Sequence, residues 1–229
     1  MKKKIKLTKE QVQQIKDYIK IKKLNYIDLY IETVDHIASD IEKLMNENEC
    51  HFEDAFEIVK RKWNISLKKT TNVWFGFATY MPSILIRKSL KIYRPLFIKS
   101  IITVVGFTLM LYVFSEKFIE LFSHNKTNIL SFISICLIVY IGFVLYWYVR
   151  IKLTKVNSTY SFVFNKRIVS NILTALLFYL VFNNNYVNKD DKINFTIIAL
   201  LVFLFTTFII GNYLFKKHFE AMKMFKTIE

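Results

Sequence analysis

Long apolar runs in the second half of the chain constrain its fold more than any other feature. Residues 95–115, 129–149 and 193–215 are almost entirely apolar, and the last two of these runs carry no charged residue. A helix needs about 20 such residues to cross a hydrocarbon layer of about 30 Å, because lipid offers the backbone no hydrogen-bond partner. The sequence therefore predicts an all-α, polytopic membrane protein.

A fourth apolar run, residues 168–182, is shorter and contains Asn171. Its length leaves two interpretations open. It is either a short fourth span, extended toward the interface by Lys166 and Arg167, or a buried half-helix that leaves only three spans. The first interpretation predicts four transmembrane helices, at about 95–115, 129–149, 168–182 and 193–215.

The distribution of basic residues favours four spans. Lysine and arginine near the ends of spans are retained on the cytoplasmic side. Five basic residues precede the first span, and two, five, two and four follow in the successive connections and the tail. This alternation predicts a multi-pass membrane protein, with both termini cytoplasmic and membrane lipid as a partner. The basic residues after the first span are Lys117 and Lys126; Arg150, Lys152, Lys155, Lys166 and Arg167; Lys189 and Lys192; Lys216, Lys217, Lys223 and Lys226.

Residues 1–72 have the pattern of a small cytoplasmic helical domain. Thr8 and Gln11 have the spacing of a capping box, which predicts a helix from there to about residue 23. Apolar residues at steps of three and four predict a second helix at about 26–45 and a third at about 52–63, with a turn near Asn46 and Asn48. A domain of three short helices gains stability from docking on the membrane part or on a second copy, so homo-oligomers are among the expected partners.

The following segment, residues 73–94, is predicted to be an interfacial, amphipathic and basic linker. Residues 74–86 are rich in aromatic side chains, too short to span and interrupted by Pro82. Residues 95–229 then form the predicted transmembrane domain. Five basic residues around the linker's end are candidates for contact with anionic lipid, although orientation alone also explains them. They are Arg87, Lys88, Lys91, Arg94 and Lys99.

The second predicted helix carries the candidate partner-binding face. Asp28, Glu32, His36 and Asp40 recur every four residues opposite the apolar stripe, and Asp35 lies beside them. A carboxylate and an imidazole one turn apart can hold a divalent metal, but the ligand set here is incomplete. We therefore predict a surface for an unidentified protein partner, with no catalytic residue, metal or cofactor.

The spans themselves indicate packing rather than transport. No ionisable residue lies at mid-depth, where a charge would mark an ion or proton pathway. One glycine lies in each of three spans (Gly106, Gly142 and Gly211), and each is predicted to let helices approach closely. The net charge of +15 is concentrated at the membrane ends and accompanies no nucleic-acid recognition motif, so no nucleic-acid partner is predicted.

The alternative to a non-enzymatic protein is a membrane enzyme or a transport accessory subunit. Its chemistry would use polar residues in the first and third connections between spans, which the charge pattern places outside the cell. These residues lack the arrangement of a general base. These residues are Glu116, Glu120, His124, Asp190 and Asp191.

Residues 30–56 resemble the helical, signalling-associated (HAAS-like) cytoplasmic domain at the N-terminus of many bacterial membrane proteins. Glu32, Asp35 and His36 match the acidic and Asp-His part of that pattern. A second part, Phe-Glu-Glu-Ala, is matched by residues 52–55, while Cys50 and His51 replace the usual Gly and Ser. The resemblance covers about a quarter of the chain. It implies a signalling or interaction role and a location in a bacterial inner membrane.

Overall fold

The computed structural model describes residues 5–114, 126–185 and 195–228, which form two compact units. The first, here the N-terminal unit, comprises Met1–Leu90, Val156–Thr159 and His218–Glu229. The second, here the bundle unit, comprises Lys91–Lys155 and Tyr160–Lys217. The connections 115–125 and 186–194 lie outside the described residues, and with them the predictions made for their charged residues. The charged residues concerned are Glu116, Lys117, Glu120, His124, Lys189, Asp190, Asp191 and Lys192.

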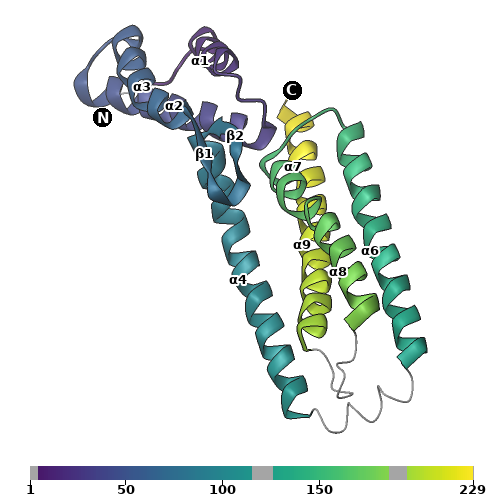
Figure 1. Ribbon diagram of the computed structural model, residues 1–229. Helices are drawn as coiled ribbons and strands as arrows, with labels where there is room; N and C mark the ends of the chain where they lie inside the picture. Colours follow the sequence, from purple (N-terminus) through teal and green to yellow (C-terminus); the bar gives the residue numbers. More distant parts are fainter. Residues whose placement is uncertain (1–4, 115–125, 186–194, 229) are drawn as a thin grey trace. The chain divides into compact units, whose positions relative to one another are not determined.

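The helices predicted in the first 70 residues are present as α1 (Lys9–Ile21), α2 (Ile27–Asn48) and α3 (Phe52–Leu67) (Figure 1). Thr8 and Gln11 form the predicted capping box, in which each side chain accepts a hydrogen bond from the other residue's backbone N–H. The turn after α2 differs from the prediction. The helix continues through Asn46 and Asn48, and Glu49 takes the left-handed conformation with φ 50°.

The core of the N-terminal unit lies where these helices meet. Tyr18 of α1 packs edge-to-face on Phe56 of α3, and its hydroxyl donates to Asn64 Oδ1 at 3.0 Å. On α2, the buried stripe is wider than the apolar pattern predicts. It includes Leu29 and the fully buried Thr33, which lie outside the predicted apolar stripe.

A β-hairpin forms at residues 69–82, which overlap the first part of the interfacial linker predicted at residues 73–94. It consists of β1 (Lys69–Asn72), a 3₁₀ turn η1 (Val73–Phe75) and β2 (Gly76–Pro82), with Lys69 opposite Pro82 and an irregular register toward the tip. The Asn72 side chain accepts from the Trp74 N–H, and Gly76 has φ 93°, which suits glycine. Helix α4 (Ser83–Val113) begins directly after β2 and continues through Pro95. The segment is therefore a hairpin followed by a continuous helix rather than a linker.

Three helices in the described residues are long and apolar enough to cross a membrane, which confirms the prediction of a transmembrane protein. The qualifying stretches are Ser83–Val113, Ser131–Leu153 and Ala199–Phe225. They belong to α4, α6 (Lys126–Leu153) and α9 (Phe195–Ile228). The fourth run forms α8 (Asn171–Asn185), which is shorter. It follows α7 (Thr159–Val163) and a π-helical turn, η2 (Phe164–Ile168), closed by a bond from Val169 N to Phe164 O of 3.2 Å.

An aromatic cluster centred on Trp147 holds the bundle unit together. The Trp147 ring lies 5.1 Å from Phe208, 5.9 Å from Phe215 and 6.3 Å from Phe164 between ring centroids. Gly211 lies against this cluster: a Cβ added there would stand 3.0 Å from the Trp147 ring and 3.2 Å from Ile168. This close approach agrees with the packing role predicted for Gly211.

Gly106 and Gly142 do not occupy the contacts predicted for them. A Cβ added at either position would meet no atom within 4 Å, and both residues are exposed. Hydroxyl groups make two of the contacts onto α9 instead, between Ser100 and Thr206 at 2.5 Å and between Tyr140 and Thr207 at 3.3 Å. Glycine content within a span does not reveal which of its faces meets a neighbour.

Candidate functional site on helix α2

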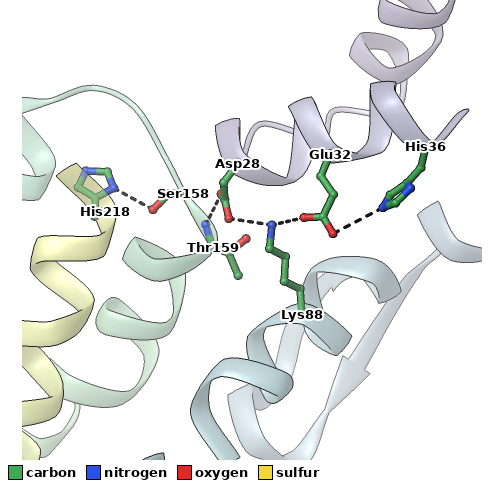
Figure 2. Close-up of polar contacts among 7 residues, drawn as sticks. All are labelled: Asp28, Glu32, His36, Lys88, Ser158, Thr159 and His218. Carbon is green, nitrogen blue, oxygen red and sulfur yellow. Dashed lines mark hydrogen bonds and ion pairs between the residues drawn. The ribbon is translucent and has the colours of Figure 1, made fainter. Parts of the chain in front are cut away.

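Asp28, in the first turn of α2, lies at the centre of a polar cluster in the N-terminal unit (Figure 2). Its Oδ1 accepts a hydrogen bond of 2.8 Å from the Thr159 backbone N–H. Its Oδ2 meets the Lys88 ammonium as an ion pair at 3.1 Å, without hydrogen-bond alignment. Only 10% of the Asp28 side chain is exposed. Asp28, which the sequence predicts to face a partner, therefore contacts other residues of the same chain instead.

Lys88 connects two carboxylates of α2 to α4. Besides Asp28, its ammonium donates to Glu32, whose other oxygen lies 3.9 Å from His36 Nε2 (Figure 2). Its side chain is 22% exposed, so the structure does not support Lys88 as a lipid contact. Helical spacing indicates why this prediction fails for Lys88. The residue lies three positions after Leu85, which is buried, and is therefore beside the packed face of α4.

The connection between α6 and α7 completes the cluster. Asn157 O accepts a hydrogen bond of 2.9 Å from Ile27 N, at the start of α2. The next residue, Ser158, pairs its hydroxyl with Nδ1 of His218, a residue of α9, at 2.9 Å. Both side chains are fully buried, so this serine and histidine cannot reach a dissolved substrate and serve to join chain segments. No local sequence pattern pointed to this pair, because 60 residues separate its members.

The second half of the polar stripe of α2 packs on α3. Asp40 Oδ2 accepts hydrogen bonds from Trp63 Nε1 at 3.0 Å and from Lys62 at 2.9 Å, and the His36 ring stacks on the Trp63 ring. Burial alone would raise the pKa of Asp40, but the two hydrogen bonds and the Lys62 charge outweigh it and hold the pKa below its ordinary value. Asp40 therefore remains an anion at neutral pH.

These contacts leave only part of the predicted partner face accessible. Asp35 is exposed, the His36 side chain is 59% exposed and the Glu32 side chain is 48% exposed. Asp28 and Asp40 instead hold α2 against its neighbours. The accessible patch, here the α2 patch, consists of Glu32, Asp35 and His36.

The other basic candidates near the start of α4 remain accessible. Arg87, Lys91 and Arg94 are exposed and follow one another at helical spacing, so they share one face of α4. Arg87 also donates to Ser66 Oγ at 2.9 Å. Lys99 is exposed as well, and it belongs to the bundle unit with Lys91 and Arg94, whereas Arg87 belongs to the N-terminal unit. Four of the five candidates therefore remain available to lipid.

Neither a metal centre nor a relative defines this site further. Within residues 5–114, 126–185 and 195–228, no group of three or more His, Cys, Asp or Glu side chains is placed to hold a metal ion. Comparisons of the chain with protein-family models, with curated proteins and with solved structures gave no match.

Proposed function

We propose that this chain is a non-enzymatic, membrane-anchored interaction protein, in which the α2 patch receives a protein partner and the bundle unit holds the complex in a bacterial inner membrane. The observation that carries the proposal is the polar cluster around Asp28. It joins the helix bearing the patch to α4, to the α6–α7 connection and, through Ser158, to α9. A partner bound to α2 would thus affect the start of α4, the α6–α7 connection and the end of α9, all within the N-terminal unit. The HAAS-like pattern of residues 30–56 supports a signalling role.

The proposal includes four spans, with both termini in the cytoplasm. Residues 156–159 and 218–228 belong to one compact unit with the first 90 residues, which supports a shared compartment for all three segments. A shared compartment requires an even number of crossings between residues 159 and 218. Helix α9 supplies one crossing, and α8 is the helix available for the other. The 15 residues of α8 span about 22 Å, and the turns of α7 and η2 before it lengthen the helical path.

Cysteine labelling tests this topology. In a chain with Cys50→Ser and Cys136→Ser, a cysteine from Lys189→Cys should react with a membrane-impermeant maleimide in intact cells. A cysteine from Lys20→Cys, on α1, should react only after the membrane is permeabilised. Protection of both positions in intact cells would mean that α8 does not cross, and the four-span proposal would be wrong.

Quantitative co-purification tests the partner surface. Cross-linked membranes from the native host would be solubilised, and proteins bound to the wild type compared with those bound to Asp35→Asn/His36→Gln. Because both residues are exposed, and His36 makes a stacking contact with Trp63 and a long pair with Glu32, we expect a small change in thermal stability. We expect at least a tenfold loss of one partner, the loss that about 1.4 kcal/mol of contact energy produces.

The matched control lies on the same helix. Lys43 and Glu47 form an exposed pair at 3.9 Å, so Lys43→Gln/Glu47→Gln removes one charge of each sign without touching the patch. This control should retain the partner that the test variant loses. Equal recovery of every protein with both variants would show that the α2 patch is not a partner surface.

A further inference from the structure

The β1–β2 hairpin carries an exposed apolar patch that the proposed function does not use. Val73 in its turn is 70% exposed, and Phe77 and Tyr80 on β2 are 72% and 69% exposed. Phe75, between them in sequence, is only 5% exposed, so the uncovered side chains lie on either side of a buried ring in the sequence. The protein thus leaves two aromatic rings and one aliphatic side chain uncovered within an element of 14 residues.

The exposure is not confined to one face of the hairpin. Phe77 and Ala78 are neighbours on β2 and both are exposed, although successive strand residues point to opposite faces. A protein groove that receives a strand commonly covers one face and pairs one edge. A hairpin inserted by its tip into the headgroup region of a bilayer is instead surrounded on both faces.

Basic side chains border the same element on both sides. Lys68 and Lys69 are exposed where β1 begins, and Arg87, Lys91 and Arg94 form the exposed basic face of α4 soon after β2 ends. Aromatic rings combined with lysine and arginine are typical of segments that lie at an anionic membrane surface. Charge complementarity therefore favours anionic lipid over another basic surface, including a second copy of this hairpin.

The hairpin is also within reach of the bilayer. Twelve residues of α4 separate Ser83 from Pro95, where the apolar run begins, and they span about 18 Å of helix. The seven residues of β2 extend about 23 Å, so the hairpin is long enough to cover that distance.

We propose that the β1–β2 hairpin is a membrane-interface anchor, whose Val73, Phe77 and Tyr80 side chains enter the headgroup region of an anionic leaflet while Lys68 and Lys69 contact lipid phosphates. This anchoring is separate from partner binding and holds the start of α4 at the surface. Two-stranded hairpins are marginally stable in water, and burial of the tip in the interface stabilises this one.

Site-directed fluorescence in vesicles tests the proposal. The full chain with Cys50→Ser, Cys136→Ser and Phe77→Cys would be labelled with an environment-sensitive nitrobenzoxadiazole probe. It would be reconstituted in phosphatidylcholine alone and in equal parts phosphatidylcholine and phosphatidylglycerol. We expect blue-shifted emission and strong quenching by headgroup-spin-labelled lipid, both greater in the anionic vesicles. A probe attached through Ile58→Cys on α3, where the native Ile58 is 53% exposed, should keep water-like emission.

Charge variants test whether anionic lipid causes the blue shift and the quenching at position 77. Lys68→Gln/Lys69→Gln should reduce quenching at position 77 at least twofold in the anionic vesicles, whereas Lys9→Gln/Lys20→Gln, on α1, should not. Water-like emission at position 77 in both vesicle types would overturn the proposal. So would blue-shifted emission that lipid-borne quencher does not reach, because that result would place the hairpin against protein.

Discussion

Lys88→Met should lower the free energy of unfolding of the N-terminal unit by about 3 kcal/mol, because it leaves the Asp28 carboxylate buried without its counter-ion. For a unit of about 100 residues, a loss of that magnitude corresponds to a fall of about 12–24 °C in the unfolding midpoint of the unit. Hydrogen exchange in detergent should locate the effect, with faster exchange at the start of α2 and in residues 156–159.

Two further variants separate the ion pair from a general effect of charge. Lys91→Met removes an exposed lysine of the same helix and should change the midpoint little. Asp28→Asn combined with Lys88→Met should recover much of the loss, since the amide oxygen can still accept from Thr159 N and no buried charge remains. If Lys88→Met were no more destabilising than Lys91→Met, the ion pair would not hold the unit together.

Gly211→Ala should destabilise the bundle unit by about 1–3 kcal/mol, because the added Cβ is forced against the Trp147 ring and Ile168. The ring cannot withdraw easily, since Phe208 and Phe215 pack on it. Thermal unfolding in detergent, followed by the loss of monodisperse protein, measures the effect.

The other span glycines provide matched controls for Gly211→Ala. Gly106→Ala and Gly142→Ala add the same methyl group in open space. We expect each to be neutral or to stabilise its helix by about 0.5–1 kcal/mol, because alanine loses less backbone entropy than glycine in a helix. Equal effects at all three positions would contradict the close approach of α9 to Trp147.

The two destabilising variants also bear on function. Lys88→Met weakens the connection between α2 and α4 and removes the ion-pair partner of Glu32, but it leaves Asp35 and His36 of the α2 patch in place. This variant should therefore still bind the proposed partner while losing the coupling to its membrane helices. Asp35→Asn/His36→Gln should have the opposite effect. Comparing partner recovery with hydrogen exchange in both variants distinguishes a binding surface from a mechanical connection.

The sequence by itself determined the features that depend on neighbouring residues. Apolar runs predicted the membrane-crossing helices, and the capping box of Thr8 with Gln11 marked the start of α1. Helical spacing also placed Asp28, Glu32, His36 and Asp40 on one face of α2. Each of these follows from backbone hydrogen bonding and residue periodicity within about two turns of helix, which a linear pattern records.

Only the tertiary structure decided how those faces are used. Lys88 is 56 residues from Glu32, Thr159 is 131 residues from Asp28, and no periodicity links such distant positions. The hairpin at residues 69–82 forms through pairing between strands, and its aromatic residues resembled an interfacial helix in the linear pattern. Among three span glycines, contact with Trp147 distinguishes Gly211, because close packing depends on the helix that lies opposite and not on the glycine itself.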